Sequence, residues 1–106
     1  MDYEILQMKR GDDLRFIRFE SFERNDGKVR MDHYNKVYEG HVMSGKHHNA
    51  LLEELFQKFN LDRPEDFRGH SLSMSDIVKL NDKLYYCDSI GWVEVVETHA
   101  GTLMKV

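Results

Sequence analysis

The clearest periodic pattern in the chain lies in residues 49–60. Five apolar side chains recur there at the spacing of one helix face, namely Leu51, Leu52, Leu55, Phe56 and Phe59. Charged and amide side chains occupy the opposite face. Because a helix of this length is not stable alone, the pattern predicts one amphipathic helix packed on a sheet, with Leu55 and Phe56 in the core.

Short apolar or alternating runs predict strands at residues 3–9, 34–42, 77–80, 84–87 and 92–96. Asn81, Asp82 and Lys83 separate two of these runs, and because Asn and Asp tolerate positive φ, the two runs are expected to form a hairpin. With the run that follows, the hairpin makes a three-stranded meander over about residues 76–97. The chain is therefore expected to be an α+β domain built on a small antiparallel sheet.

Three further segments carry weaker patterns. Residues 14–23 fit neither a strand period nor a helix period, and a shorter helix is the favoured interpretation, with a strand as the alternative. A loop is expected at residues 44–46, and residues 62–67 predict a capped turn that directs Phe67 into the core. Residues 98–106 predict a flexible C-terminal tail, which leaves a single domain at residues 1–97.

Composition narrows the class of protein. A chain of 106 residues with 41% apolar and 32% charged residues is typical of one soluble globular domain. The net charge of −4 argues against nucleic acid or an anionic membrane as the partner. No apolar run approaches the ~20 residues of a membrane span, and the N-terminus lacks the pattern of a secretory signal. Cys87 is the only cysteine, which suits a reducing cytoplasm.

The titratable residues offer two kinds of chemistry. Six histidines invite a metal site, but they lack the spacings that zinc ligands usually show, so neither a metal nor another cofactor is expected. His70, Asp76 and Cys87 permit a small Cys/His-dependent enzyme, since an imidazole can activate a thiolate. A lone cysteine in a strand is more often a small core residue, and catalysis is therefore the alternative hypothesis.

The run GHSLSMSD at residues 69–76 is too polar for ordinary core. In one interpretation its short polar side chains satisfy nearby backbone groups in a turn. In the other, they form with a nearby tryptophan an exposed groove in which a partner chain pairs along the sheet edge. The candidate interaction or structural motif comprises His70, Ser71, Ser73, Ser75, Asp76 and Trp92. The first interpretation is favoured because local hydrogen bonding by Ser and Asp is common near turns.

The runs FNLDRPEDFRGHSLSMSDIVKL and YYCDSIGWVEV, with LRFIRF and YNKVYEG upstream, resemble the YodL-like domain family over residues 3–97. The most specific part of the resemblance is PEDFRGHSLSMSD, residues 64–76. The resemblance implies a cytosolic protein of Firmicutes-type bacteria, often encoded on conjugative and other mobile elements. It implies no catalytic residues.

These observations together predict a non-enzymatic interaction domain, an accessory protein of a mobile element with an unidentified host or element-encoded protein partner. The small enzyme is the first alternative. The second alternative is a nucleic-acid-associated accessory protein, which is disfavoured because no basic face is visible in the sequence.

Overall fold

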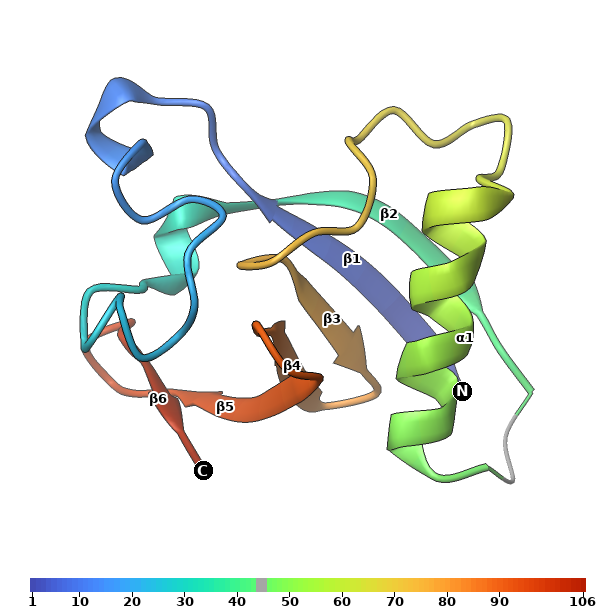
Figure 1. Cartoon of the computed structure of the whole chain (residues 1–106). Helices are drawn as coiled ribbons and strands as arrows, with labels where there is room; N and C mark the ends of the chain where they lie inside the picture. Colours follow the sequence, from blue (N-terminus) through green and yellow to red (C-terminus); the bar gives the residue numbers. More distant parts are fainter. Residues whose placement is uncertain (44–45) are drawn as a thin grey trace.

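The computed structural model describes residues 1–43 and 46–106, so the loop predicted at residues 44–46 lies largely outside the described residues. One helix, α1 (His48–Leu61), accompanies six strands: β1 (Asp2–Met8), β2 (Tyr34–His41), β3 (Ile77–Leu80), β4 (Lys83–Cys87), β5 (Trp92–Glu97) and β6 (Leu103–Lys105). All neighbouring strands are antiparallel, in the order β2-β1-β3-β4-β5-β6. The predicted α+β class is confirmed (Figure 1).

Helix α1 packs its apolar stripe on one face of the sheet. Leu51, Leu52, Leu55 and Phe59 are buried, together with inward-facing strand residues such as Ile5 and Val78. Phe56 is only partly buried, because it lies at the margin of this cluster and meets the Trp92 ring at 6.4 Å between centroids. The predicted helix is therefore present, although only Leu55 of the two expected core residues is fully enclosed.

The opposite face of the sheet is covered by irregular chain. Residues 9–33 lie across it and contribute the buried Val29, while Ile17 and Phe22 pack against its apolar cluster from the side (Figure 1). The shorter helix predicted at 14–23 is wrong. A 3₁₀ turn at Asp12–Leu14 is followed by successive turns, and the described residues contain no second α-helix. The helix fails because Phe19 has φ +66°, which a right-handed helix cannot contain.

The hairpin between β3 and β4 forms as predicted, with Asn81 at φ +53° in its turn. The three-stranded meander needs correction, because β3, β4, β5 and β6 follow one another as four neighbouring strands. Residues 98–106 do not form the expected flexible tail. Leu103 is fully buried, and its amide donates to the Val29 carbonyl at 2.8 Å. The folded unit therefore extends beyond residue 97.

Candidate functional site

The polar run at residues 69–76 is anchored to β1 by a glutamine. Gln7 occupies the inward position that follows Tyr3 and Ile5 along the strand and is only 3% exposed. Its Nε2 donates to the His70 carbonyl at 2.9 Å and to Asp76 Oδ2 at 3.1 Å, and its Oε1 accepts from the His70 amide at 3.2 Å. Gln7 therefore fixes both ends of the run. Gln7 was not among the predicted site residues, although a polar residue at an inward strand position indicates a buried hydrogen-bonding role.

Asp76 lies at the centre of this network. Its side chain is 1% exposed, and Oδ2 accepts from the Ser73 amide at 2.8 Å as well as from Gln7. Oδ1 has no hydrogen-bond partner among the described residues, and the nearest basic atom is Nε2 of His70 at 3.7 Å. Burial raises the pKa of the Asp76 carboxyl to about 8, against the two hydrogen bonds, which act in the opposite direction.

The His70 ring is oriented by the backbone. Its Nδ1 lies 2.7 Å from the Ser71 carbonyl oxygen, and since a carbonyl only accepts, this nitrogen must donate. Nε2 lies 3.7 Å from Asp76 Oδ1, which is too far for a direct hydrogen bond. The His70 side chain is 24% exposed.

Two of the three serines of the motif bond backbone groups through their hydroxyls, Ser73 within the motif and Ser75 in a distant segment. The Ser73 hydroxyl donates to the Ser71 carbonyl at 2.8 Å. Ser75 is fully buried, and its hydroxyl oxygen accepts from the Phe19 amide at 2.9 Å, while its carbonyl accepts from the Tyr34 hydroxyl at 2.6 Å. The structure thus brings together His70, Ser71, Ser73, Ser75 and Asp76. It places Trp92 apart from them, on β5 against Phe56 of α1.

Cys87 is positioned as a core residue. Its amide donates to the Asp76 carbonyl at 2.8 Å, so the two residues are neighbours through their backbones. The thiol is buried, and burial, reinforced by the nearby Asp76 and Asp88 carboxyl groups, raises its pKa to about 12. No hydrogen bond joins it to His70 within the part of the chain that is described. The arrangement does not supply the thiolate that a cysteine nucleophile requires.

Basic side chains gather outside His70 in a depression we call the basic cleft. It consists of two cavities of about 390 Å³ and 260 Å³ that share Met8, Arg10 and His70. The remaining lining residues are Gln7, Lys9, Asn35, Val37, Arg68 and Gly69 in the larger cavity, and Arg18 and Phe19 in the smaller. No sequence pattern marks the basic cleft, because its cations are separated along the chain and meet only through the fold.

The chain matches the YodL-like domain family over residues 2–98. It belongs to this family. No curated protein and no solved structure matches the chain. Within its described residues, the YodL-like domain has no helix with the length and hydropathy needed to span a membrane. The same residues contain no group of three or more His, Cys, Asp or Glu side chains placed to hold a metal ion.

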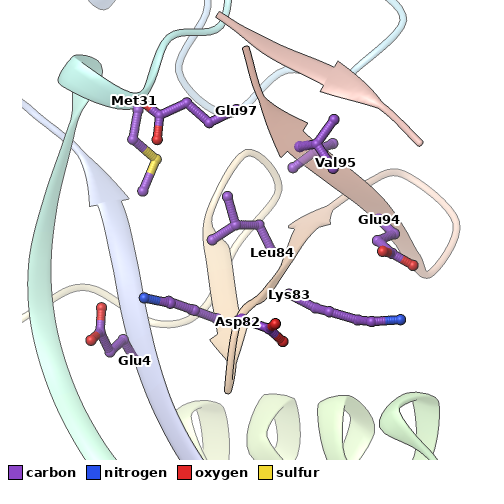
Figure 2. Close-up of a pocket in the computed structure, with 10 residues that line it drawn as sticks. Glu4, Met31, Asp82, Lys83, Leu84, Glu94, Val95 and Glu97 are labelled. Carbon is purple, nitrogen blue, oxygen red and sulfur yellow. The ribbon is translucent and has the colours of Figure 1, made fainter. Parts of the chain in front are cut away.

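A third depression in the YodL-like domain lies on the sheet face opposite α1. Figure 2 shows Leu84 and Val95 in this hollow of about 430 Å³, with Glu4, Asp82 and Lys83 toward one end. Four carboxylates (Glu4, Asp82, Glu94 and Glu97) and two ammonium groups (Lys79 and Lys83) line it, which leaves an excess of negative charge. Neither of the two buried side-chain atoms that lack a hydrogen bond among the described residues, Asn60 Oδ1 and Asp76 Oδ1, belongs to its lining.

The outer surface of the last two strands carries exposed apolar side chains. Val96 on β5 lies directly opposite Met104 on β6, and they are 49% and 54% exposed. Alternate residues of a strand share a face, so Trp92 lies on the same face as Val96, and Val106 follows Met104. Glu94 lies between Trp92 and Val96 on this face, and its carbonyl accepts from the Val106 amide at 3.0 Å. We call Trp92, Val96, Met104 and Val106 the outer β5–β6 face, which Glu94 interrupts.

Proposed function

We propose that this YodL-like domain is a non-enzymatic module that binds a partner protein through the outer β5–β6 face. We further propose that it works in the bacterial cytoplasm as an accessory factor of a mobile element, with a partner encoded by the host or by the element. The cellular context rests on the family resemblance. The observation that carries the binding function is the exposed apolar surface formed by Val96, Met104 and Val106 beside Trp92.

The geometry of this face suits a protein partner. Directly opposed residues of antiparallel strands hold their Cβ atoms about 4.5–5.5 Å apart, so Val96 and Met104 form one continuous apolar surface. Val106 extends it with 69% of its surface exposed. Trp92 stands at the other end, and half-buried tryptophan is a frequent anchor of protein interfaces. Exposed apolar patches of this kind mark interaction sites more often than chance.

The candidate catalytic groups support a non-enzymatic function. The Cys87 thiol is buried with its pKa raised to about 12, and it is therefore protonated at neutral pH. The Ser75 hydroxyl accepts a hydrogen bond from the Phe19 amide and is fully buried. Because the Cys87 thiol and the Ser75 hydroxyl are both buried, neither is accessible to a substrate.

The test compares two charge insertions of equal size. We expect Met104→Lys to abolish capture of the partner in affinity purification with quantitative mass spectrometry from a bacterial host. Leu61→Lys is the matched control, because Leu61 is 85% exposed at the end of α1 and lies outside this face. Both variants should keep the melting temperature of the parent protein, since neither position is buried.

Two results would contradict the proposal. Equal capture of the same proteins by Met104→Lys and by the parent would show that this face does not bind them. A parent dimer that Met104→Lys converts to a monomer, measured by analytical ultracentrifugation, would show that the face joins two copies of this chain instead.

A further inference from the structure

The basic cleft concentrates positive charge in a protein whose net charge is −4. Its cations are Lys9, Arg10, Arg18 and Arg68, and no carboxylate lines either of its two cavities. None of the four forms an ion pair within the described part of the chain. Lys9 also lines a neighbouring cavity with Asp13 and Asp32. Arg10, Arg18 and Arg68 repel one another, and an anion bound between them relieves that repulsion.

The cleft is also held in shape by the fold. Arg18 donates through Nη1 to the Lys9 carbonyl at 2.7 Å, which ties the 15–19 segment to the end of β1. Arg68 donates to the Glu65 carbonyl at 2.6 Å. Arg10 lines both cavities and donates no hydrogen bond to the described residues, so its guanidinium keeps its donors for a ligand.

An aromatic ring stands at the mouth of the smaller cavity. Phe19 is 49% exposed, and its ring meets the His70 ring edge-on at 5.3 Å between centroids. Its backbone has φ +66°, a conformation that costs a phenylalanine free energy, and its amide is held by the Ser75 hydroxyl. Such strain recurs at functional sites. Here it presents a phenyl ring to solvent in the cavity that Arg10 and Arg18 also line.

A second exposed ring lies three residues earlier in the same segment. Phe16 is 74% exposed, and the Arg15 guanidinium lies 4.7 Å from its centroid. The segment Arg15–Phe19 therefore alternates guanidinium groups with exposed phenyl rings. Cations that follow a phosphate backbone, combined with aromatic rings on which bases stack, are the two components of single-strand recognition.

We propose that the basic cleft binds a single strand of nucleic acid, with phosphates at Arg10 and Arg68 and an unpaired base stacked on Phe19. The larger cavity, at about 390 Å³, falls within the size range of small-ligand sites, about 300–1,000 Å³. A duplex is disfavoured because its bases are already stacked on one another and cannot reach the ring. An acidic peptide would satisfy the cations but would leave the exposed rings unused.

The first experiment measures binding of fluorescein-labelled dT15 and rU15 by anisotropy at 50 mM NaCl, with a 15-base-pair duplex and poly-glutamate as competitors. We expect the single strands to bind and to be displaced by unlabelled single strand more readily than by either competitor. Comparing dT15 with rU15 identifies which sugar is preferred. Repeating the titration at 200 mM NaCl gives the salt slope, by which we mean the slope of log K for binding against log[NaCl]. The magnitude of this slope should fall by about 0.7 for each phosphate contact that a variant removes.

Variants separate the charge contribution from the stacking contribution. Arg10→Ala should weaken binding and reduce the salt slope, whereas the matched control Arg24→Ala should not, because Arg24 lies outside the cleft and pairs with Glu20 at 3.3 Å. Phe19→Asn tolerates the positive φ but lacks the ring, and it should weaken binding about tenfold without changing the salt slope. Phe19→Tyr keeps a ring and should restore the affinity.

The proposal is overturned if dT15 and rU15 both fail to bind at 100 µM protein, or if the duplex or poly-glutamate competes as well as the single strand. It is also overturned if Phe19→Asn binds as tightly as the parent. Its failure is separable from failure of the proposed protein-binding function, because Met104→Lys changes the outer β5–β6 face and should leave binding to dT15 unchanged.

Discussion

The amide of Phe19 donates a hydrogen bond to the Ser75 hydroxyl at 2.9 Å, and both residues have positive φ, +66° and +80°. Two segments far apart in the sequence are therefore joined at a point where each backbone is strained. This hydrogen bond holds the irregular segment before β2, which contains Phe19, against the turn before β3, which contains Ser75. It also determines the position of the Phe19 ring beside His70.

Two variants of Ser75 distinguish the hydrogen bond from the strain. Ser75→Ala removes the acceptor of the part-buried Phe19 amide and keeps the positive φ, and it should lower the free energy of unfolding by about 1–3 kcal/mol. Ser75→Gly also removes the acceptor but adopts positive φ without penalty, so it should cost about 1 kcal/mol less. Urea denaturation measures both. If Ser75→Gly is less stable than Ser75→Ala by about 0.5–1 kcal/mol, the entropic cost of glycine in the unfolded chain, the backbone at Ser75 carries no strain.

The Asp76 carboxyl makes stability depend on pH. Its folded pKa of about 8 lies above the ordinary value of about 3.9, so between these limits the folded state holds a proton that the unfolded state has released. The contribution of this group is therefore complete below pH ~4 and is lost as pH rises through about 8. We expect the free energy of unfolding to fall over this range by on the order of 2–5 kcal/mol from this group.

Asp76→Asn is the control for this pH effect. The amide reproduces the shape and the acceptor of the neutral carboxyl but does not titrate. The difference in unfolding free energy between the variant and the parent should therefore grow in favour of the variant from pH 5 to pH 8. A difference that stays constant across this range would show that Asp76 is ionised in the folded protein at both pH values.

Cys87 should be unreactive in the native protein. With a pKa of about 12 and a buried side chain, the thiol is protonated at pH 8 except for roughly one molecule in ten thousand. Ellman's reagent should modify it slowly in buffer and at once in 6 M guanidinium chloride. Rapid stoichiometric reaction of the native protein at pH 7 would instead indicate a thiolate and would favour the Cys/His enzyme.

The elements that the sequence predicts well are those whose pattern is local. The apolar spacing in α1 and the runs of β3, β4 and β5 identify these elements without knowledge of their partners. The segment at 14–23 is mispredicted because its conformation is decided by a distant hydroxyl, that of Ser75. No window of sequence around Phe19 contains that information.

The candidate site is partly visible in the sequence for the same reason. Residues 70–76 lie close together in the chain, and their short polar side chains indicate a hydrogen-bonded turn. Trp92 was expected to share an exposed groove with them, but its ring packs against Phe56 of α1. The basic cleft escapes detection because Arg10 and Arg68 belong to separate segments, and dispersed charges in a sequence reveal nothing about a shared surface.

The C-terminal strand offers the most direct test of the fold. Leu103 is fully buried within the apolar cluster on the face opposite α1, so Leu103→Ala should lower the free energy of unfolding by about 2–5 kcal/mol. Its neighbour Met104 is 54% exposed, and Met104→Ala should change stability by less than about 1 kcal/mol. Chemical denaturation of the two variants gives the comparison. If residues 98–106 were a flexible tail, both substitutions would leave the free energy of unfolding unchanged. If they form a strand of the sheet, only Leu103→Ala lowers it, because only loss of the Leu103 side chain opens a cavity in the core.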